Sequence, residues 1–373
     1  MAERLRLVDL VHARLGRFLD DRQAHLDSVA DELGVFVDAG RDLLAGGKRF
    51  RALFAYWGWQ AVAGASKPDD LLATLDEHPD IDAIIDVAAA LEIFQGAALV
   101  HDDIMDSSDT RRGKPAAHRR FESMHREREW AGSASVYGMS GALLLGDLLL
   151  GWSDELLDDG LAQLGDRRAA RAARDEFRTM RTEVMLGQYL DIYEEVAWRE
   201  ADEREELPRA HRVVTYKSAK YSIEAPLALG ALMAGGTEEQ VSALRAFGLP
   251  LGVAFQLRDD LLGVFGDPEV TGKPAGDDLR EGKRTVIIAL ARAGLPVGPR
   301  ALIDELLGDP ELTHHQVATL QATIRDSGAV ETVESIIARS VAEAVAALEN
   351  APISRAATRE LIGLADTVTR RQS

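Results

Sequence analysis

The chain has 373 residues, of which 46% are hydrophobic and 28% are charged, a composition that predicts a globular protein with a large core. Its net charge of −19 argues against a general nucleic-acid-binding protein. Because the chain lacks cysteine, disulfides, thiolate metal sites and cysteine nucleophiles are excluded. The N-terminus has no apolar signal-peptide core, and the most apolar run, residues 140–152, is too short to span a bilayer and contains Asp147, so we expect a cytoplasmic protein.

The first predicted helices flank a basic turn. Apolar residues recur at intervals of three and four through residues 8–44, which predicts a helix that ends before the glycine pair at 46–47. An aromatic helical run begins at Phe50, and Lys48 and Arg51, three residues apart, are expected near its N-terminus. That is a suitable place for an anion, because the free N–H groups and the helix dipole act together. An ordinary basic turn is the alternative.

The rest of the chain shows helical periodicity interrupted by loops. Residues 199–209 are dense in charge and contain Pro208, so we expect an exposed loop there. In the long helix before it, Gln188 and Asp191 face the same way, and a surface hydrogen bond would explain this pair. No run alternates apolar and polar residues with a period of two, so we predict an all-α protein with a single domain over residues 1–373. The later predicted helices cover residues 84–101, 133–157, 168–196, 213–233, 241–265 and 285–293 and most of 301–373, with a long loop over 266–284.

A cluster of acidic residues follows the apolar helix over 84–101. Asp102 and Asp106 are four residues apart and share one helix face, and Asp103 flanks that face. A serine-rich loop closed by glycine follows, so the carboxylates should lie at the C-terminal end of the helix, where the dipole repels anions. A cation would relieve this conflict, and carboxylate oxygens suit Mg²⁺ or Mn²⁺ rather than zinc. Arg111 and Arg112 would then contact phosphate; a solvated acidic helix end is the alternative.

A second acidic pair repeats this arrangement. Asp259 and Asp260 follow an apolar helix, with Gln256 one turn earlier, and a loop rich in glycine and lysine comes next. Two such pairs suggest one shared site, in which they would face each other across a cavity and hold several Mg²⁺ ions around a diphosphate. Lys273 and Lys283 in the loop would suit a segment that covers phosphate, although an ordinary surface loop explains them equally well.

Six motifs in order resemble those of the trans-isoprenyl diphosphate (polyprenyl) synthases, and most of all the geranylgeranyl diphosphate synthases. They are G-G-K-R-F-R at 46–51, Q-x6-D-D-I-M-D-x4-R-R-G at 95–113, G-Q-Y-L-D at 187–191, K-S-A at 217–219, F-Q-L-R-D-D at 255–260 and G-K-P-A-G-D-D-L-R-E-G-K-R-T at 272–285. The resemblance implies a bundle of mostly antiparallel helices around a deep central cavity, usually in a homodimer. It also implies a prenyltransferase that condenses isopentenyl diphosphate with dimethylallyl, geranyl or farnesyl diphosphate by ionisation, condensation and elimination.

The resemblance further implies roles for individual residues. The catalytic set would be Asp102, Asp103, Asp106, Asp259, Asp260 and Lys217. Three Mg²⁺ ions, with Mn²⁺ as an alternative, would be held by Asp102, Asp106 and Asp259. The diphosphate of isopentenyl diphosphate would be bound by Lys48, Arg51, Gln95 and Arg112. The allylic diphosphate would be bound by Arg111, Lys217 and Lys273, in a site lined by Ser218 and Gln256 and closed by Lys283.

One departure from the family pattern concerns the second acidic motif. Position 263 is glycine, where many members carry a third aspartate. Metal binding there would rest on Asp259 and Asp260, with water or Asp267 in support.

The apolar helix before Asp102 also bears on product length. Ala97 and Ala98 lie one turn earlier, where bulky aromatic residues stop chain growth in the family, and Phe94 one turn further could form the floor of the cavity. This pattern favours a C20 product, geranylgeranyl diphosphate. The alanines could instead serve close helix packing. A longer-chain or farnesyl diphosphate synthase, a class I terpene cyclase or head-to-head condensing enzyme, and a non-catalytic subunit of a heteromeric synthase are the remaining alternatives.

Overall fold

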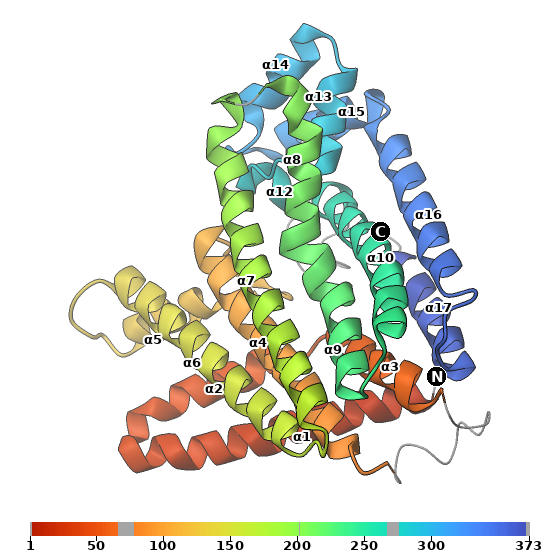
Figure 1. Ribbon diagram of the computed structural model, residues 1–373. Helices are drawn as coiled ribbons and strands as arrows, with labels where there is room; N and C mark the ends of the chain where they lie inside the picture. Colours follow the sequence, from red (N-terminus) through yellow and green to blue (C-terminus); the bar gives the residue numbers. More distant parts are fainter. Residues whose placement is uncertain (1, 66–77, 201, 267–275, 371–373) are drawn as a thin grey trace. The chain divides into compact units, whose positions relative to one another are not determined.

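The computed structural model describes residues 2–65, 78–200, 202–266 and 276–370, and these residues are almost entirely helical (Figure 1). The predicted all-α class is therefore confirmed. The chain forms two compact units, one of Met1–Arg174 with Leu229–Gly236 and one of Asp175–Ala228 with Thr237–Ser373. A single domain around a central cavity stays a prediction.

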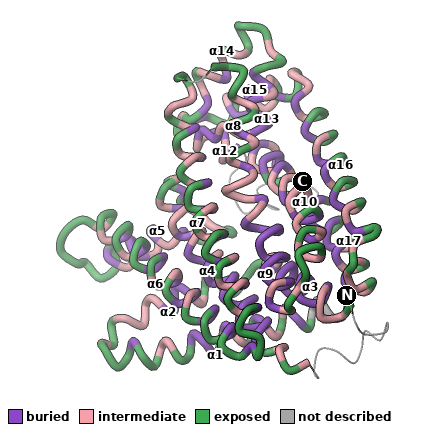
Figure 2. The backbone as a smooth tube through the Cα atoms, in the orientation of Figure 1, coloured by how far each residue is buried: buried purple, intermediate pink, exposed green. Residues whose placement is uncertain are grey.

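The first unit is built on α4 (Ile81–Met105), which packs most extensively against α6 (Ala134–Ala162). α4 is apolar nearly all round, and most of its residues are buried (Figure 2). Gly160 of α6 allows the close approach, because a Cβ atom there would lie 2.8 Å from Asp86 Cβ and 3.0 Å from Ala83 O. The unit's other elements are α1 (Ala2–Val29), η1 (Asp31–Leu33), α2 (Gly34–Leu44), α3 (Phe50–Ala63), β1 (Thr110–Arg111), β2 (Lys114–Pro115), α5 (Ala117–Glu127), the start of α7 (Arg167–Ala197) and the end of α9 (Ala225–Met233).

The second unit is built on α10 (Glu238–Phe265), which packs against α16 (Ala329–Ala347) and against η4 (Val214–Glu224), a π-helix. Gly252 lets α10 approach η4, because a Cβ atom there would lie 2.7 Å from Ala219 Cα. Thr237 and Gln240 cap the start of α10 in a reciprocal pair of hydrogen bonds. The remaining elements are η2 (Trp198–Glu200), η3 (Glu203–Glu205), α8 (Glu206–Val213), α12 (Asp277–Glu281), α13 (Val286–Gly294), α14 (Val297–Leu306), α15 (His314–Asp326) and α17 (Arg355–Thr369), with the rest of α7 and α9.

The prediction of a loop over residues 199–209 was wrong. The segment contains η3 and the start of α8. Pro208 lies in the first turn of α8, where a backbone N–H would have no acceptor within the helix, so proline does not interrupt it.

The structure contains two short local features that the sequence did not predict. β1 and β2 pair in a hairpin whose two turn residues, Arg112 and Gly113, have φ angles of 54° and 72°. Positive φ at both positions matches the right-handed twist of the strands. In the predicted loop over 266–284, α12 lies between Gly276 and Gly282, whose φ angles are 70° and 80°. Both elements are too short to leave a periodic signal.

Two helices, α4 and α6, are long and apolar enough to cross a membrane by length and composition alone, although core helices of soluble proteins pass the same test. In α4, 83% of the apolar window is buried, which identifies it as a core helix. In α6 only 33% of the window is buried. α6 therefore exposes apolar side chains that its own unit does not cover.

Candidate functional site

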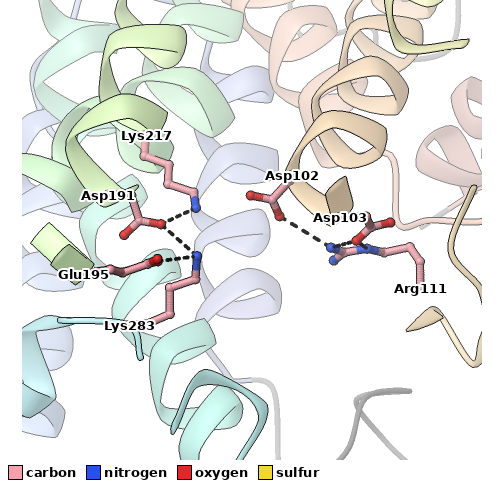
Figure 3. A network of polar contacts seen from close by, with 7 residues as sticks. All are labelled: Asp102, Asp103, Arg111, Asp191, Glu195, Lys217 and Lys283. Atoms are coloured by element: carbon pink, nitrogen blue, oxygen red, sulfur yellow. Dashed lines mark hydrogen bonds and ion pairs between the residues drawn. The ribbon is translucent and has the colours of Figure 1, made fainter. Parts of the chain in front are cut away.

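The first acidic cluster lies at the C-terminal end of α4, as predicted. Asp102 and Asp103 are in the last turn, and Asp106 is the C-cap residue. Arg111 from β1 folds back onto them: its Nε donates to Asp103 Oδ1 at 2.8 Å, and its Nη2 lies 3.4 Å from Asp102 Oδ2 (Figure 3). Asp103 is only 2% exposed. Arg111 therefore offsets charge at a helix end that disfavours carboxylates.

Arg112 joins this cluster to the basic turn before α3. Its Nη1 donates to Leu43 O at 3.1 Å and to Gly46 O at 2.8 Å. Gly47, with φ of 115°, leaves the room, since a Cβ atom there would lie 3.0 Å from Arg112 Nη2. Burial lowers the pKa of Arg112, and the positive charges of Arg49 and Arg111 lower it further. The basic turn and the β1–β2 hairpin therefore concentrate positive charge beside the acidic end of α4.

Within the basic turn, neighbouring residues have different environments. Lys48 is exposed and Arg51 is half-buried in the first turn of α3. Arg49 between them is buried, with φ of 53°, and its Nη1 donates to Glu92 Oε2 at 3.0 Å. The sequence analysis missed Arg49, which holds the turn against α4, because its partner is 43 positions away.

The second acidic cluster lies near the end of α10 and continues onto η4. Gln256 Nε2 donates to Asp260 Oδ1 at 2.7 Å, and the hydroxyl of Ser218 donates to Gln256 Oε1. Burial, together with the negative charges of Asp259 and Asp191, raises the pKa of Asp260 to about 7, although the hydrogen bond from Gln256 acts in the opposite direction. Asp260 Oδ2 is buried and has no hydrogen-bond partner within the described part of the chain.

Two lysines share one carboxylate in the same unit (Figure 3). Lys217 Nζ donates to Asp191 Oδ2 at 2.5 Å, Lys283 Nζ donates to the same oxygen at 3.1 Å, and Lys283 Nζ lies 2.9 Å from Glu195 Oε1. Burial alone would raise the pKa of Asp191, but the charges of Lys217 and Lys283 outweigh burial and hold it below its usual range. Burial raises the pKa of Glu195.

Sequence reasoning placed Asp191 in a motif but gave it no role, and it missed Glu195 altogether. A surface hydrogen bond does not account for Asp191, because this residue is only 7% exposed and its carboxylate binds two lysines. The only available signal was the position of Asp191 in the G-Q-Y-L-D motif.

Close approach of α7 and η4 brings Asp191 to Lys217. A Cβ atom on Gly187 would lie 2.5 Å from the carbonyl carbon of Tyr216 and 2.7 Å from Lys217 Cα. Any residue with a Cβ atom at this position would require the backbone at the crossing to shift. Lys217 and Ser218 also lie in a π-helix, a rare conformation that is frequent at functional sites.

The carboxylate of Asp278 occupies the space in which a side chain at position 263 would lie. A Cβ atom there would lie 2.6 Å from Asp278 Oδ1, and the other carboxylate atoms are nearer still. Asp278, in α12, thus presents its carboxylate one turn after Asp259. Lys273 and Asp267 lie outside the described residues.

The residues predicted to limit product length lie along α4. Phe94 is 2% exposed and Ala97 is fully buried, while Gln95 and Ala98 are half-buried. His101, next to Asp102, lies with its Nε2 3.4 Å from Leu143 O and 3.6 Å from Asp147 Oδ1.

The carboxylates suit a hard cation that keeps other ligands. Among the residues that the structure describes, no group of three acidic, histidine or cysteine side chains could hold an ion by itself. Mg²⁺ commonly takes only one or two protein carboxylates, with water and substrate phosphates completing its shell. The buried Asp260 oxygen without a partner and the paired acids at the end of α4 fit this kind of binding.

An almost entirely helical fold in which carboxylates lie beside arginines and lysines is suited to an enzyme that acts on phosphorylated substrates. The polyprenyl synthetase family matches residues 35–324. The chain belongs to this family and is a trans-prenyltransferase.

Individual relatives agree with this assignment. The chain is 31% identical over 300 residues to the short chain isoprenyl diphosphate synthase of Methanocaldococcus jannaschii, covering 78% of this chain and 79% of that protein. It is 33% identical over 282 residues to the geranylfarnesyl diphosphate synthase of Aeropyrum pernix, covering 75% and 80%. A crystal structure of geranylgeranyl pyrophosphate synthase from Corynebacterium glutamicum, complexed with isoprenyl diphosphate and magnesium, is similar with a TM-score of 0.89 and 39% identity, covering 98% of this chain and 99% of that one.

Proposed function

We propose that this enzyme condenses isopentenyl diphosphate with an allylic diphosphate and makes geranylgeranyl diphosphate. One observation carries the proposal: Asp191 holds Lys217 and Lys283 in place within the unit that also contains Asp259 and Asp260. Cations fixed in advance stabilise negative charge as it develops on a departing diphosphate, without reorganisation at the moment of reaction.

Mg²⁺ would be held by Asp102 and Asp106 in the first unit and by Asp259 in the second. Three ions are expected, and Mn²⁺ is an alternative. When bound, these ions supply Lewis-acid neutralisation of the diphosphate charge. Asp103 and Asp260 are supporting residues, since Arg111 binds the first and Gln256 the second. Asp278, whose carboxylate lies against Gly263, joins the second cluster.

The basic residues divide between two substrates. Lys217, Lys273 and Arg111 bind the allylic diphosphate, with Ser218 and Gln256 alongside and Lys283 closing the site. Lys48, Arg51, Gln95 and Arg112 bind isopentenyl diphosphate, and Arg112 also fixes the turn that carries Lys48. These contacts orient the double bond of one substrate toward the ionising carbon of the other, and the proton that is lost afterwards goes to the released diphosphate. Loss of such positioning typically has a large effect on rate.

The relatives and the residues of α4 support a C20 product. Similar proteins are named as geranylgeranyl and geranylfarnesyl diphosphate synthases, so C25 is the second candidate. Ala98 is half-buried, whereas Ala97 has no exposed surface, so position 98 is the better place for a bulky probe. Ala98→Phe should shorten the product, and Ala98→Ser, which changes little volume, should not. Unchanged product length in the phenylalanine variant would contradict the assignment of this face of α4 to the growing chain.

The proposal also includes a cytoplasmic homodimer. The exposed face of α6 carries Val136, Met139, Leu143 and Leu144, which are 62%, 53%, 51% and 54% exposed. An apolar stripe of this kind is typical of a surface covered by a partner. Light scattering of the purified protein measures the mass in solution, and a monomer at working concentration would contradict this part of the proposal.

The deciding experiment is a condensation assay. The protein is incubated with isopentenyl diphosphate and each of dimethylallyl, geranyl and farnesyl diphosphate, with Mg²⁺ or with a chelator, and the dephosphorylated products are separated by chromatography. A C20 product that requires Mg²⁺ is expected. A C15 product, or products longer than C20, would correct the chain length. No consumption of isopentenyl diphosphate with any primer would favour a non-catalytic subunit.

A further inference from the structure

Glu92 is a buried carboxylate on α4 to which the proposed reaction gives no role. It is 6% exposed and lies three residues before Gln95, so the two side chains share one face of the helix. Its Oε2 accepts from Arg49 Nη1 at 3.0 Å, and its Oε1 lies 3.4 Å from the backbone nitrogen of Ala52. These partners are 43 and 40 positions away along the chain, so Glu92 joins α4 to the basic turn and to the first turn of α3.

Arg49 also connects Glu92 to the end of α2. Its Nη2 donates to Leu44 O, a carbonyl at the C-terminus of α2, where the helix dipole favours a cation. Gly96 of α4 packs against the same end of α2, because a Cβ atom there would lie 3.3 Å from Cδ2 of Leu43 and of Leu44. Arg49 therefore lies where α2, α3 and α4 meet, and Glu92 is its carboxylate partner there.

The backbone conformation of Arg49 depends on this junction. Arg49 is the N-cap residue of α3 and has φ of 53°. A residue other than glycine rarely adopts this conformation, and the surrounding structure has to hold it. The side chain of Arg49 is buried, whereas Lys48 before it is exposed and Arg51 after it is half-buried. The ion pair with Glu92 thus stabilises the turn that places Lys48 and Arg51.

The charge of Glu92 also acts on the arginines around the basic turn. Burial and the charge of Arg49 lower the pKa of Arg112, and the charge of Glu92 opposes them. Arg111 and Arg51 lower the pKa of Arg112 further. The side chains of Arg49 and Glu92 are 4% and 8% exposed, so solvent screens their ion pair little. Without the carboxylate, repulsion between Arg49 and Arg112 would favour separation of the basic turn from the β1–β2 hairpin.

We propose that Glu92 is a positioning residue for isopentenyl diphosphate. Through Arg49 it fixes the basic turn to α4, so that cations from the turn and the amide of Gln95 are presented together. This inference rests on the proposed function, in which Lys48, Arg51 and Gln95 bind that diphosphate. Glu92 acts through Arg49 rather than by contact with the substrate.

The test compares Glu92→Gln with the wild type in steady-state kinetics and in calorimetric titration with isopentenyl diphosphate alone. Glutamine has no charge and one acceptor oxygen, so either Arg49 or the Ala52 N–H would face an NH2 group. The KM and the Kd for isopentenyl diphosphate should rise roughly tenfold or more, because the cations of its site are no longer held in place. The KM for geranyl diphosphate should stay at the wild-type value, because Asp191 still holds Lys217.

Asp86→Asn is the matched control. Asp86 is also a carboxylate of α4 that is 6% exposed, and it accepts from Arg14 and Gln163. Asp86→Asn should lower the urea midpoint of unfolding, as Glu92→Gln does, but should leave both KM values unchanged. An equal rise in the KM for isopentenyl diphosphate in the two variants would indicate general damage to α4 and overturn the inference.

The remaining outcomes separate this inference from the proposed function. Unchanged KM and Kd in Glu92→Gln would overturn the inference and leave the proposed function intact. Wild-type protein that neither binds nor consumes isopentenyl diphosphate would overturn the proposed function, and the role of Glu92 with it. If Glu92→Gln does not fold, Arg49→Lys takes its place, because lysine keeps the charge but lacks the planar fork that reaches Glu92 and Leu44 O together. Weaker binding of isopentenyl diphosphate is expected from Arg49→Lys, and unchanged binding would overturn the inference.

Discussion

Gly187→Ala tests whether the crossing of α7 and η4 sets the position of Lys217. The added Cβ atom would lie 2.5 Å from the carbonyl carbon of Tyr216 and 2.7 Å from Lys217 Cα. Ordinary contacts between carbon atoms are about 3.5–4.0 Å, so the shortfall is roughly 1 Å. Because the opposing atoms belong to the backbone, no side-chain rotation can relieve it.

Two opposing effects determine how much Gly187→Ala changes the free energy of unfolding. Alanine gains about 1 kcal/mol over glycine in a helix interior. Overpacking typically costs about 1–3 kcal/mol, and contact with several backbone atoms at once places Gly187→Ala at the upper end. The net expectation is a loss of about 2 kcal/mol in the free energy of unfolding. Displacing Lys217 by about 1 Å should also lower kcat/KM by roughly 10²-fold.

The assay pairs denaturant unfolding with steady-state condensation kinetics. Gly151→Ala is the matched control, since Gly151 also lies within a helix, α6, but has nothing within 4 Å of its Cβ position. That variant should be about 1 kcal/mol more stable than the wild type and fully active. If Gly187→Ala matches Gly151→Ala in both measurements, close backbone approach does not position Lys217.

The remaining predictions concern two carboxylates. Gly263→Ala should change the free energy of unfolding by less than about 1 kcal/mol, because the Asp278 side chain can rotate away from the new methyl group. It should nevertheless raise the Mg²⁺ concentration needed for half-maximal activity. An unchanged Mg²⁺ dependence would show that Asp278 does not belong to the second cluster. Asp191→Asn removes the carboxylate that Lys217 and Lys283 share, while Glu195 still binds Lys283, and it should destabilise the protein by about 3 kcal/mol at neutral pH. The pKa of Asp191 is lowered in the folded state, so the wild type has this stabilisation above the unfolded pKa of about 4 and loses it as pH falls further. The difference between the two proteins in urea midpoints should therefore shrink below about pH 4, and a constant difference would show that the charge of Asp191 is not responsible.

Local sequence signals predicted the first acidic cluster well. The apolar run, the four-residue spacing of Asp102 and Asp106 and the serine-rich loop all act within one or two turns, so the end of α4 could be placed without tertiary information. The start of α3 followed from the glycine pair and the aromatic run in the same way. Backbone conformation within the basic turn could not be predicted, because the left-handed φ of Arg49 depends on Glu92 in another helix.

Pairings between distant residues account for what sequence reasoning missed at the second cluster. Asp191 is 26 positions from Lys217 and 92 from Lys283, and no periodic pattern links such residues. Gly263 appeared to be a missing ligand because only position 263 was considered. The structure fills that place with the carboxylate of Asp278, from a helix too short to leave a periodic signal.

The charges around Asp191 explain how the second unit can hold cations ready for a substrate. A buried Lys283 beside a half-buried Lys217 would be unfavourable without an anion, so Asp191 stabilises both before any diphosphate arrives. Asp191 presents a single oxygen to both lysines, whereas a diphosphate offers several oxygens and more negative charge. A diphosphate can therefore compete for Lys217 and Lys283 without either lysine having to move far. Lys283 has a second partner in Glu195, whose pKa is raised by burial, so this carboxylate is easier to neutralise and binds the lysine less firmly than Asp191 does.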